Sequence, residues 1–178
     1  MNYTNISRGK RKDNPNEWVY GYYYCVYADE ESEHKAFTDR GLIFPDSEDF
    51  HHYILPIDGE CAKNKTIEDS RVEIIPKTYG LCSMIPDNTN SRMLFTGDIV
   101  KVSVAGAEDV LCIVSFGNCG GAHNVKSSVG YMGFYLEPGN ELSKKLMNFC
   151  LRNDPLYFYG KQRLEVVGNI HDDPQLLI

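Results

Sequence analysis

The sequence lacks any run of 18 apolar residues, the length at which an apolar stretch becomes a candidate membrane-spanning helix. Its first residues also lack the basic and then apolar design of a secretory signal peptide. The six cysteines form no Cys-x-x-Cys pair, a spacing that is typical of zinc and dithiol sites. These absences predict a cytoplasmic protein that does not bind membranes and keeps its cysteines as free thiols.

Positive charge is scarce, with 18 Lys and Arg residues against 25 Asp and Glu residues and a net charge of −7 at pH 7. Binding nucleic acid over a large surface needs many cations, so the overall charge argues against such a surface. Four cations nevertheless gather in residues 8–12, whereas residues 13–60 hold 12 acidic and 2 basic residues. A local basic arm therefore stands beside a strongly acidic segment.

Aromatic and β-branched residues predict a chain built mainly from strands. Residues 6–12 and 18–27, separated by the turn residues 13–16, predict an N-terminal hairpin. Gly21 inside the second strand indicates a bulge or a bend. Further strands are predicted at residues 50–55, 71–76, 98–104, 110–116, 130–136 and 163–170, with a strong turn at 86–91 and a glycine loop at 117–121.

One helix is predicted over residues 141–152. Asn140 is a suitable N-cap, and apolar residues recur along one face of this segment. Many short strands with a single helix are typical of a small, mainly β barrel or roll. A length of 178 residues predicts a single domain over residues 1–178.

Four segments resemble the YopX family of small phage and prophage proteins. They are residues 8–14 with 17–21, 72–80, 96–101 and 165–174; the third reads Thr-Gly-Asp-Ile-Val-Lys and the fourth contains Val-Val-Gly-Asn-Ile. The resemblance implies an SH3-like barrel or roll at about residues 71–178, with N-terminal hairpins at about residues 1–70 packed on it. It also implies a phage or prophage origin in a bacterial host, and no known activity.

The sequence departs from the family pattern before the third of these segments. The family usually has a glycine-containing turn there, whereas residues 84–92 contain no glycine. Asparagine tolerates left-handed backbone geometry better than most residues do. Asn88 and Asn90 are therefore expected to replace the glycine in this turn.

The tyrosine-rich strand is the first candidate binding surface. Alternation places Tyr20, Tyr22 and Tyr24 on one face of the strand and Val19 and Tyr23 on the other. If one face belongs to the core, the other exposes an aromatic strip, which is typical of a surface that binds a protein or a second copy. The alternative is that the fold covers both faces.

The basic arm is the second candidate. Arg8, Lys10 and Arg11 could attract phosphates while Trp18 stacks on bases. The alternative interpretation is a solvated face of the first strand beside the tyrosines.

The glycine-containing pairs near strand ends have a structural interpretation. Asp98 follows Gly97 and is expected to hydrogen-bond turn amides, although a lone carboxylate could also act as an acid. Asn169 follows Gly168 and is expected to form a turn or a bulge at the last strand.

Catalytic and metal sites are not predicted. Cys119 and His123 could pair as a thiolate and a base, but no orienting partner is visible. His51 and His52 are adjacent in a predicted strand, so their side chains point to opposite faces and cannot easily chelate one ion. No second pair of short-range ligands completes a zinc site.

The leading hypothesis is a non-enzymatic interaction module without a cofactor or metal, which binds a host or phage protein or a second copy of itself. The alternative is a nucleic-acid-binding accessory protein that uses residues 8–12.

Overall fold

The computed structural model describes residues 6–28, 50–57, 66–103, 108–119, 131–150 and 163–178. The chain divides into two compact units, Met1–Leu81 and Cys82–Ile178. Both are built from antiparallel strands, which confirms the mainly β prediction. In the described part of the chain, no helix is long and apolar enough to cross a membrane.

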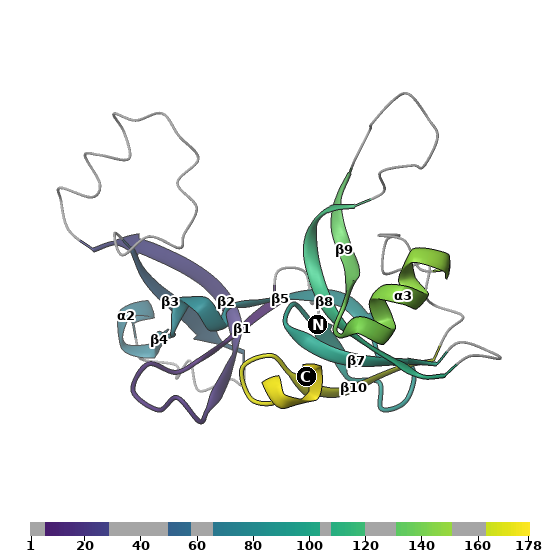
Figure 1. The fold of residues 1–178 in the computed structure, drawn as a ribbon. Helices are drawn as coiled ribbons and strands as arrows, with labels where there is room; N and C mark the ends of the chain where they lie inside the picture. The colour runs from purple at the N-terminus through teal and green to yellow at the C-terminus, as the bar shows by residue number, and fades with distance from the viewer. Residues whose placement is uncertain (1–5, 29–49, 58–65, 104–107, 120–130, 151–162) are drawn as a thin grey trace. The chain divides into compact units, whose positions relative to one another are not determined.

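The first unit is an antiparallel sheet with the strand order β4-β3-β2-β1-β5 (Figure 1). The predicted N-terminal hairpin is confirmed, because β1 pairs with β2 from Ile6 opposite Tyr22 to Lys10 opposite Trp18. The elements of this unit are β1 (Ile6–Lys10), β2 (Trp18–Tyr27), β3 (Phe50–Pro56), helix α2 (Ile67–Ser70), β4 (Val72–Glu73), the 3₁₀ turn η1 (Pro76–Thr78) and the first residues of β5 (Gly80–Pro86).

One face of this sheet carries the core of the first unit. Val19, Ile54 and Ile74 are buried together, and the ring of Tyr23 packs against them. Val19 and Tyr23 are two steps of alternation apart on β2, so they point to the same side. Tyr20 and Tyr22, which alternate with these residues, do not belong to this core.

Gly21 marks a close approach between strands rather than a bulge. The register of β2 against β1 and β3 runs through Gly21 without a shift. A Cβ at this position would collide with the carbonyl group of Leu55 on β3. The prediction of a bulge is therefore wrong, and the glycine is explained by the lack of room for any side chain.

The predicted strand at residues 71–76 is shorter than expected. Only β4 is regular, and Pro76 begins η1, where its fixed φ and missing N–H fit the first position of a helical turn. Helix α2 was not predicted, although Thr66 and Asp69 cap its first turn reciprocally.

The second unit contains a four-stranded antiparallel sheet with the order β10-β7-β8-β9 (Figure 1). The remainder of β5 pairs with β6 in the same unit, with Cys82 opposite Phe95. The predicted strands and helix of this region are confirmed. The elements are β6 (Met93–Phe95), β7 (Asp98–Ser103), β8 (Val110–Cys119), β9 (Tyr131–Pro138), α3 (Glu141–Cys150), β10 (Arg163–Asn169) and the 3₁₀ turn η3 (Pro174–Leu177).

Valine, leucine and cysteine side chains from five strands form the core of the second unit. Helix α3 packs on β8 and β9, and it is capped by Asn140, whose Oδ1 accepts a hydrogen bond of 2.9 Å from the Ser143 amide. The buried cluster consists of Leu94, Val100, Val102, Val110, Cys112, Val114, Leu136 and Leu164.

Two sequence-based predictions for this unit are wrong. The residues predicted as a glycine loop begin as strand, because β8 continues to Cys119 and pairs with β9 through Gly117 opposite Gly133. The left-handed residues of β5 and the following turn are Met84 (φ 64°) and Ser91 (φ 56°), not asparagines.

A buried aspartate organises the turn that follows β5. Asp87 accepts hydrogen bonds from the amides of Asn90 (2.7 Å) and Arg92 (3.1 Å), and a longer one from Val166 on β10 (3.4 Å). Burial opposes ionisation of this carboxyl, but the backbone donors outweigh it, so the pKa of Asp87 lies below its usual value. The ionised side chain thus stabilises the folded state.

The variant Asp87→Asn is expected to lower the free energy of unfolding by about 1–2 kcal/mol at pH 7. The native pKa is depressed, so this stabilisation is present above the unfolded pKa and is lost as pH falls through the lower native value. Urea unfolding at pH 7 and at about pH 3 checks this. A deficit of the same size at both values would contradict the assignment.

Candidate functional site

The face of the first sheet opposite its core carries most of the predicted binding residues. Trp18, Tyr20, Tyr22 and Tyr24 alternate along this side of β2, and Tyr24 lies opposite Tyr53 of β3. We call these five side chains the aromatic face.

Two tyrosines at the centre of the aromatic face are exposed. Tyr20 is 40% exposed and Tyr22 is 47% exposed, whereas Val19 between Trp18 and Tyr20 is buried in the core. Over residues 19–22, strand β2 therefore has a buried side and an exposed side, which corresponds to the first of the two arrangements that the sequence left open.

The basic arm forms strand β1 and joins the aromatic face. Arg8 lies opposite Tyr20 and Lys10 lies opposite Trp18 across the strand pair. The guanidinium carbon of Arg8 is 4.7 Å from the centre of the Trp18 ring, and the Lys10 ammonium is 5.6 Å from it. Arg8 is only 1% exposed. The two cations are therefore held against tryptophan by cation–π contacts.

A third cation, Arg71, lies at the other end of the aromatic face. The guanidinium carbon of Arg71 is 4.2 Å from the centre of the Tyr53 ring. Tyr53 in turn stacks on Tyr24, with 5.6 Å between ring centres. The contact with Tyr24 is the largest influence on the pKa of Arg71, which is raised. The two exposed tyrosines thus lie between Trp18 and Tyr53, and each of these two rings is in contact with at least one cation.

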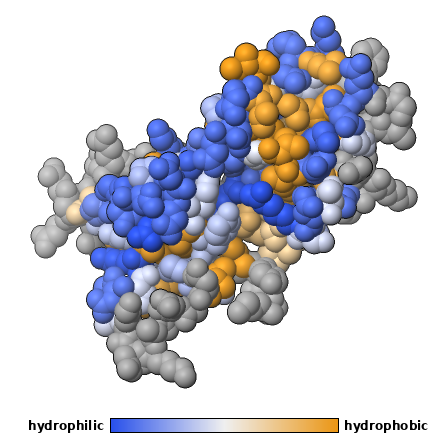
Figure 2. Space-filling view, turned by 90° about the horizontal axis from the view of Figure 1, so that it is seen from below, coloured by the Kyte–Doolittle hydropathy of each residue, from blue (hydrophilic) through white to orange (hydrophobic). Residues whose placement is uncertain are grey.

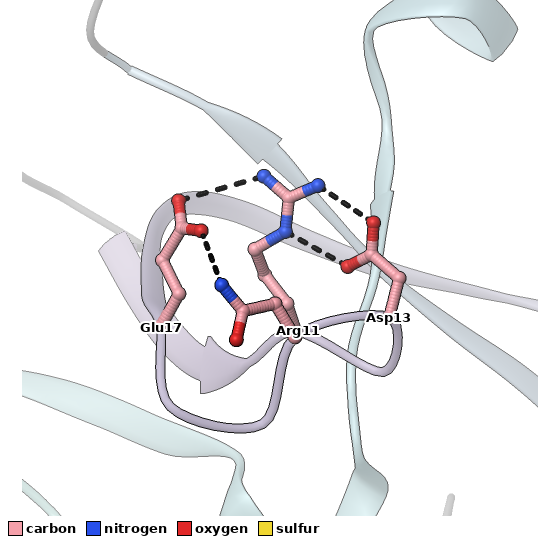
Figure 3. Close-up of polar contacts among 4 residues, drawn as sticks. Arg11, Asp13 and Glu17 are labelled. Atoms are coloured by element: carbon pink, nitrogen blue, oxygen red, sulfur yellow. Dashed lines mark hydrogen bonds and ion pairs between the residues drawn. The ribbon is translucent and has the colours of Figure 1, made fainter.

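The remaining cations of the arm are paired with carboxylates. In the turn after β1, Arg11 binds Asp13 through two hydrogen bonds of 2.8 Å and approaches Glu17 at 3.5 Å (Figure 3). Asp13 raises the pKa of Arg11, and the pKa of Asp13 is lowered in return. The charge of Arg11 is offset within its own turn.

Glu73 on β4 is the partner of Lys12. Its Oε1 lies 2.7 Å from the Lys12 ammonium and 3.1 Å from Nδ1 of His51. Partial burial works against ionisation, but Lys12 and His51 outweigh it and lower the pKa of Glu73. The hydrogen bond to Glu73 raises the pKa of Lys12.

The glycine-containing pairs of the second unit meet at one point. Asp98 and Asn169 lie opposite each other on β7 and β10, and Asn169 Nδ2 donates to Asp98 at 3.4 Å. The other oxygen of Asp98 accepts from the Phe95 amide at 2.9 Å. Gly97 has a φ of +85°, which a residue with a side chain rarely adopts. This arrangement holds a turn against the last strand.

Gly168 lies next to a register shift in the same strand pair. The shift falls between Val166 and Gly168, and a Cβ on Gly168 would come within 2.7 Å of the Asp173 carboxylate. That carboxylate accepts a hydrogen bond of 3.1 Å from the Asn169 amide. Gly97, Asp98, Gly168 and Asn169 therefore have a structural role, in which the two side chains bind each other and backbone amides.

The candidates for catalysis and metal binding are placed only in part. His123 and the side chain of Cys119 fall outside the described residues. His51 binds Glu73, whereas His52 is buried on the core side, where its Nδ1 lies 2.8 Å from the Tyr23 hydroxyl. Within the described ranges, no three His, Cys, Asp or Glu side chains gather as metal ligands would.

Among the cysteines whose side chains the structure describes, one has a thiol that solvent can reach. Cys25, Cys82 and Cys112 are free thiols, of which Cys25 is exposed. Burial raises the pKa of the Cys112 thiol to about 12. Cys112 is thus held in its neutral, unreactive form.

Most of the surface seen in Figure 2 is hydrophilic, with hydrophobic residues gathered in limited areas. Phe116 on β8 is 44% exposed and contacts the ring of Phe134 at 5.0 Å between ring centres. It is an exposed aromatic residue of the second unit and is comparable in exposure to Tyr20 and Tyr22.

Three contributors to the site were not predicted from the sequence: Tyr53, Arg71 and Glu73. Each lies on or beside a predicted strand, but their relation to the tyrosines depends on the pairing of β2 with β3 and of β3 with β4. The alternation of His51, Tyr53 and Leu55 was the available signal. This alternation places the side chains of His51, Tyr53 and Leu55 on one face of their strand, but it does not show that Tyr53 lies next to Tyr24.

Comparisons with protein-family models, with curated proteins and with solved structures find no significant match. Membership of the YopX family, an SH3-like topology and a phage or prophage origin therefore stay predictions from the sequence.

Proposed function

We propose that this protein is a non-enzymatic interaction module, and that the aromatic face binds a partner protein. The observation that carries the proposal is the exposure of Tyr20 and Tyr22, 40% and 47%, on the side of β2 opposite the core. Neither ring packs on the buried cluster of Val19, Ile54 and Ile74. Threonine or a charged residue would satisfy the strand there and interact better with water.

The composition of the aromatic face matches the centre of a protein–protein interface. Tyrosine, tryptophan and arginine are the residues most enriched among those that dominate binding energy. A tyrosine ring buries a large apolar area on docking, while its hydroxyl keeps a hydrogen bond. Cation–π contacts restrain the rings of Trp18 and Tyr53, so less side-chain freedom is lost when a partner docks.

Binding of single-stranded nucleic acid is the second candidate. It is favoured by the position of Arg8 and Lys10 against Trp18 beside two exposed tyrosines. Stacking on bases, however, needs an open ring face, and both cations lie over the Trp18 ring. Arg11 and Lys12, the other cations of the arm, are paired with carboxylates. A protein partner makes better use of this surface.

The proposed setting is the cytoplasm of a bacterial host, with a host or phage protein as the partner. This setting is what the YopX resemblance implies.

Removing the two exposed rings is expected to abolish binding. Peptides are selected from a random library on the immobilised full-length protein, and the affinity of the best one is measured by fluorescence anisotropy. The double variant Y20T/Y22T keeps residues that favour strands but loses both rings. It should weaken the Kd at least about 30-fold, equivalent to about 2 kcal/mol.

The matched control is Phe116→Thr, which removes a ring of similar exposure from the second unit. It should change the Kd less than about threefold. Loss of binding in Phe116→Thr but not in Y20T/Y22T would show that the peptide does not dock on the aromatic face. The nucleic-acid candidate would be favoured if no peptide is selected and if labelled oligo-dT binds in a way that depends on Tyr20 and Tyr22. Light scattering identifies a second copy as the partner if Y20T/Y22T converts a dimer into a monomer.

A further inference from the structure

A polar pocket of about 350 Å³ lies at one edge of the first sheet. It is built from the turn that follows β1 and from β4 with the residue before it. Its walls are formed by Arg11, Lys12, Asp13, Arg71, Val72 and Glu73.

The charges that line this pocket are not balanced. Arg11 is bound to Asp13, and Lys12 is bound to Glu73. Among the described residues, no carboxylate lies within ion-pair distance of Arg71, whose guanidinium lies over the Tyr53 ring. In the walls of the pocket three cations face two carboxylates, while outside the walls Glu17 lies 3.5 Å from Arg11 and Glu68 acts on Arg71 from a longer distance. Arg71 is therefore the wall cation whose guanidinium has no carboxylate in direct contact.

Arg71 also connects the pocket with the aromatic face. Its guanidinium carbon is 4.2 Å from the centre of the Tyr53 ring, and Tyr53 stacks on Tyr24 with 5.6 Å between ring centres. Tyr24 and Tyr22 are alternate residues of one strand, about 7 Å apart. An extended peptide repeats its side chains at the same spacing. One such peptide could therefore place an apolar side chain on Tyr22 and a neighbouring side chain at Arg71.

We infer that this pocket binds a carboxylate of the partner, and that the aromatic face takes a peptide segment in which an acidic residue accompanies apolar ones. The inference rests on the proposed function and names the chemistry of its partner. A guanidinium held on a ring presents its N–H edge as a fork, which matches the two oxygens of a carboxylate.

A carboxylate fits this pocket better than a phosphate does. Asp13 and Glu73 stand in the same walls, and their charge repels a dianion more strongly than a monoanion. The third positive charge is balanced by a single negative charge. Inorganic phosphate is therefore the appropriate competitor in a test.

The first test uses acetate as the carboxylate probe, with the full-length ¹⁵N-labelled protein. The Nε–Hε resonance of Arg71 should shift saturably with sodium acetate, should not shift with chloride at equal ionic strength, and should shift less with phosphate. The expected shift does not depend on any peptide. Its absence would overturn the carboxylate site even if the aromatic face binds a protein.

The second test uses a selected peptide and a copy in which each acidic residue is replaced by its amide. Wild-type protein should bind the amide copy at least about tenfold more weakly, equivalent to about 1.4 kcal/mol. In Arg71→Gln the two peptides should differ less than about twofold, because the partner of the carboxylate is gone. Lys77→Gln removes an exposed cation of η1 and should leave the tenfold difference in place.

The outcomes separate the two proposals. Peptide binding that requires Tyr20 and Tyr22 but is independent of the acidic residues and of Arg71 would support the docking surface and contradict the carboxylate site. A shift of the Arg71 resonance with acetate, together with peptide binding that is independent of Tyr20 and Tyr22, would support the carboxylate site and contradict the docking surface. Trp18 fluorescence verifies that Arg71→Gln keeps the first unit folded.

Discussion

Replacing Asp98 by alanine is expected to destabilise the second unit by about 3 kcal/mol. Asp98 is fully buried, with 0% exposure. Its two oxygens accept hydrogen bonds from the Phe95 amide and from the side chain of Asn169. Alanine removes both acceptors at once and leaves buried donors behind, and water cannot replace them without opening the turn against β10.

Hydrogen–deuterium exchange followed by mass spectrometry measures this effect unit by unit. In Asp98→Ala, peptides that cover β7 and β8 should exchange about 100-fold faster, because 3 kcal/mol lowers protection by that factor. Peptides that cover β2 and β3 should not change. Asp109→Ala, an exposed aspartate near the start of β8, is the matched control and should change neither set. Unchanged protection of β7 and β8 in Asp98→Ala would refute the structural role of this carboxylate.

Gly21→Ala is expected to destabilise the first unit by about 3 kcal/mol, although alanine is the smallest residue with a side chain. The added Cβ would overlap the Leu55 carbonyl and come within 2.8 Å of the Ile54 side chain. The obstacle is the backbone of a paired strand, which cannot rotate away as a flexible side chain can. Strands β2 and β3 must therefore separate locally, at the centre of the unit.

Trp18 is the only tryptophan and lies on the same strand, so its fluorescence reports this unit directly. The urea midpoint of Gly21→Ala should fall with little change in the slope of unfolding free energy against urea. Gly117→Ala is the matched control, since a Cβ on that strand glycine meets only the Tyr135 side chain, at 3.5 Å, an ordinary contact. Because Gly117 lies in the second unit, the unfolding of both variants is also followed by circular dichroism. An equal effect of the two substitutions would contradict the steric explanation.

Local sequence patterns predicted the strands whose own residues favour the extended conformation. Strand β2 was placed at residues 18–27, which are its observed bounds, because nearly every residue in it is aromatic or β-branched. The helix α3 was found from its cap and its apolar periodicity. Strands β7 and β10 were found for the same reason as β2.

Strand β5, helix α2 and the end of strand β8 were not predicted from the sequence. Strand β5 pairs with β1 and with β6, and it contains Met84 in a left-handed conformation, so its own residues show no continuous β pattern. Helix α2 is a single turn whose capping box was present in the sequence but too short to stand out. The β strand through Gly117 exists because β9 pairs with it, which local composition cannot show.

The candidate site was predicted in its parts and not in its arrangement. Alternation separated Tyr20 and Tyr22 from Tyr23, and the structure has the first two exposed and the third packed on the core. The basic arm was interpreted either as a polyanion-binding segment or as a solvated face of the first strand, whereas Arg8 is buried against Trp18 and Arg11 is bound to Asp13. Pairing of β3 with β4 brings Glu73 opposite Tyr53, with Arg71 close by, and no local signal encodes that register.

The most direct measurement of the central claim is the position of a selected peptide on the protein. Tyrosine rings are labelled with ¹³C, and contacts between the peptide and each ring are observed by isotope-filtered NMR. We expect contacts with Tyr20 and Tyr22 and none with the Tyr23 ring, which packs against the core on the other side of the strand. A peptide that contacts neither Tyr20 nor Tyr22 would show that the aromatic face is not the docking surface.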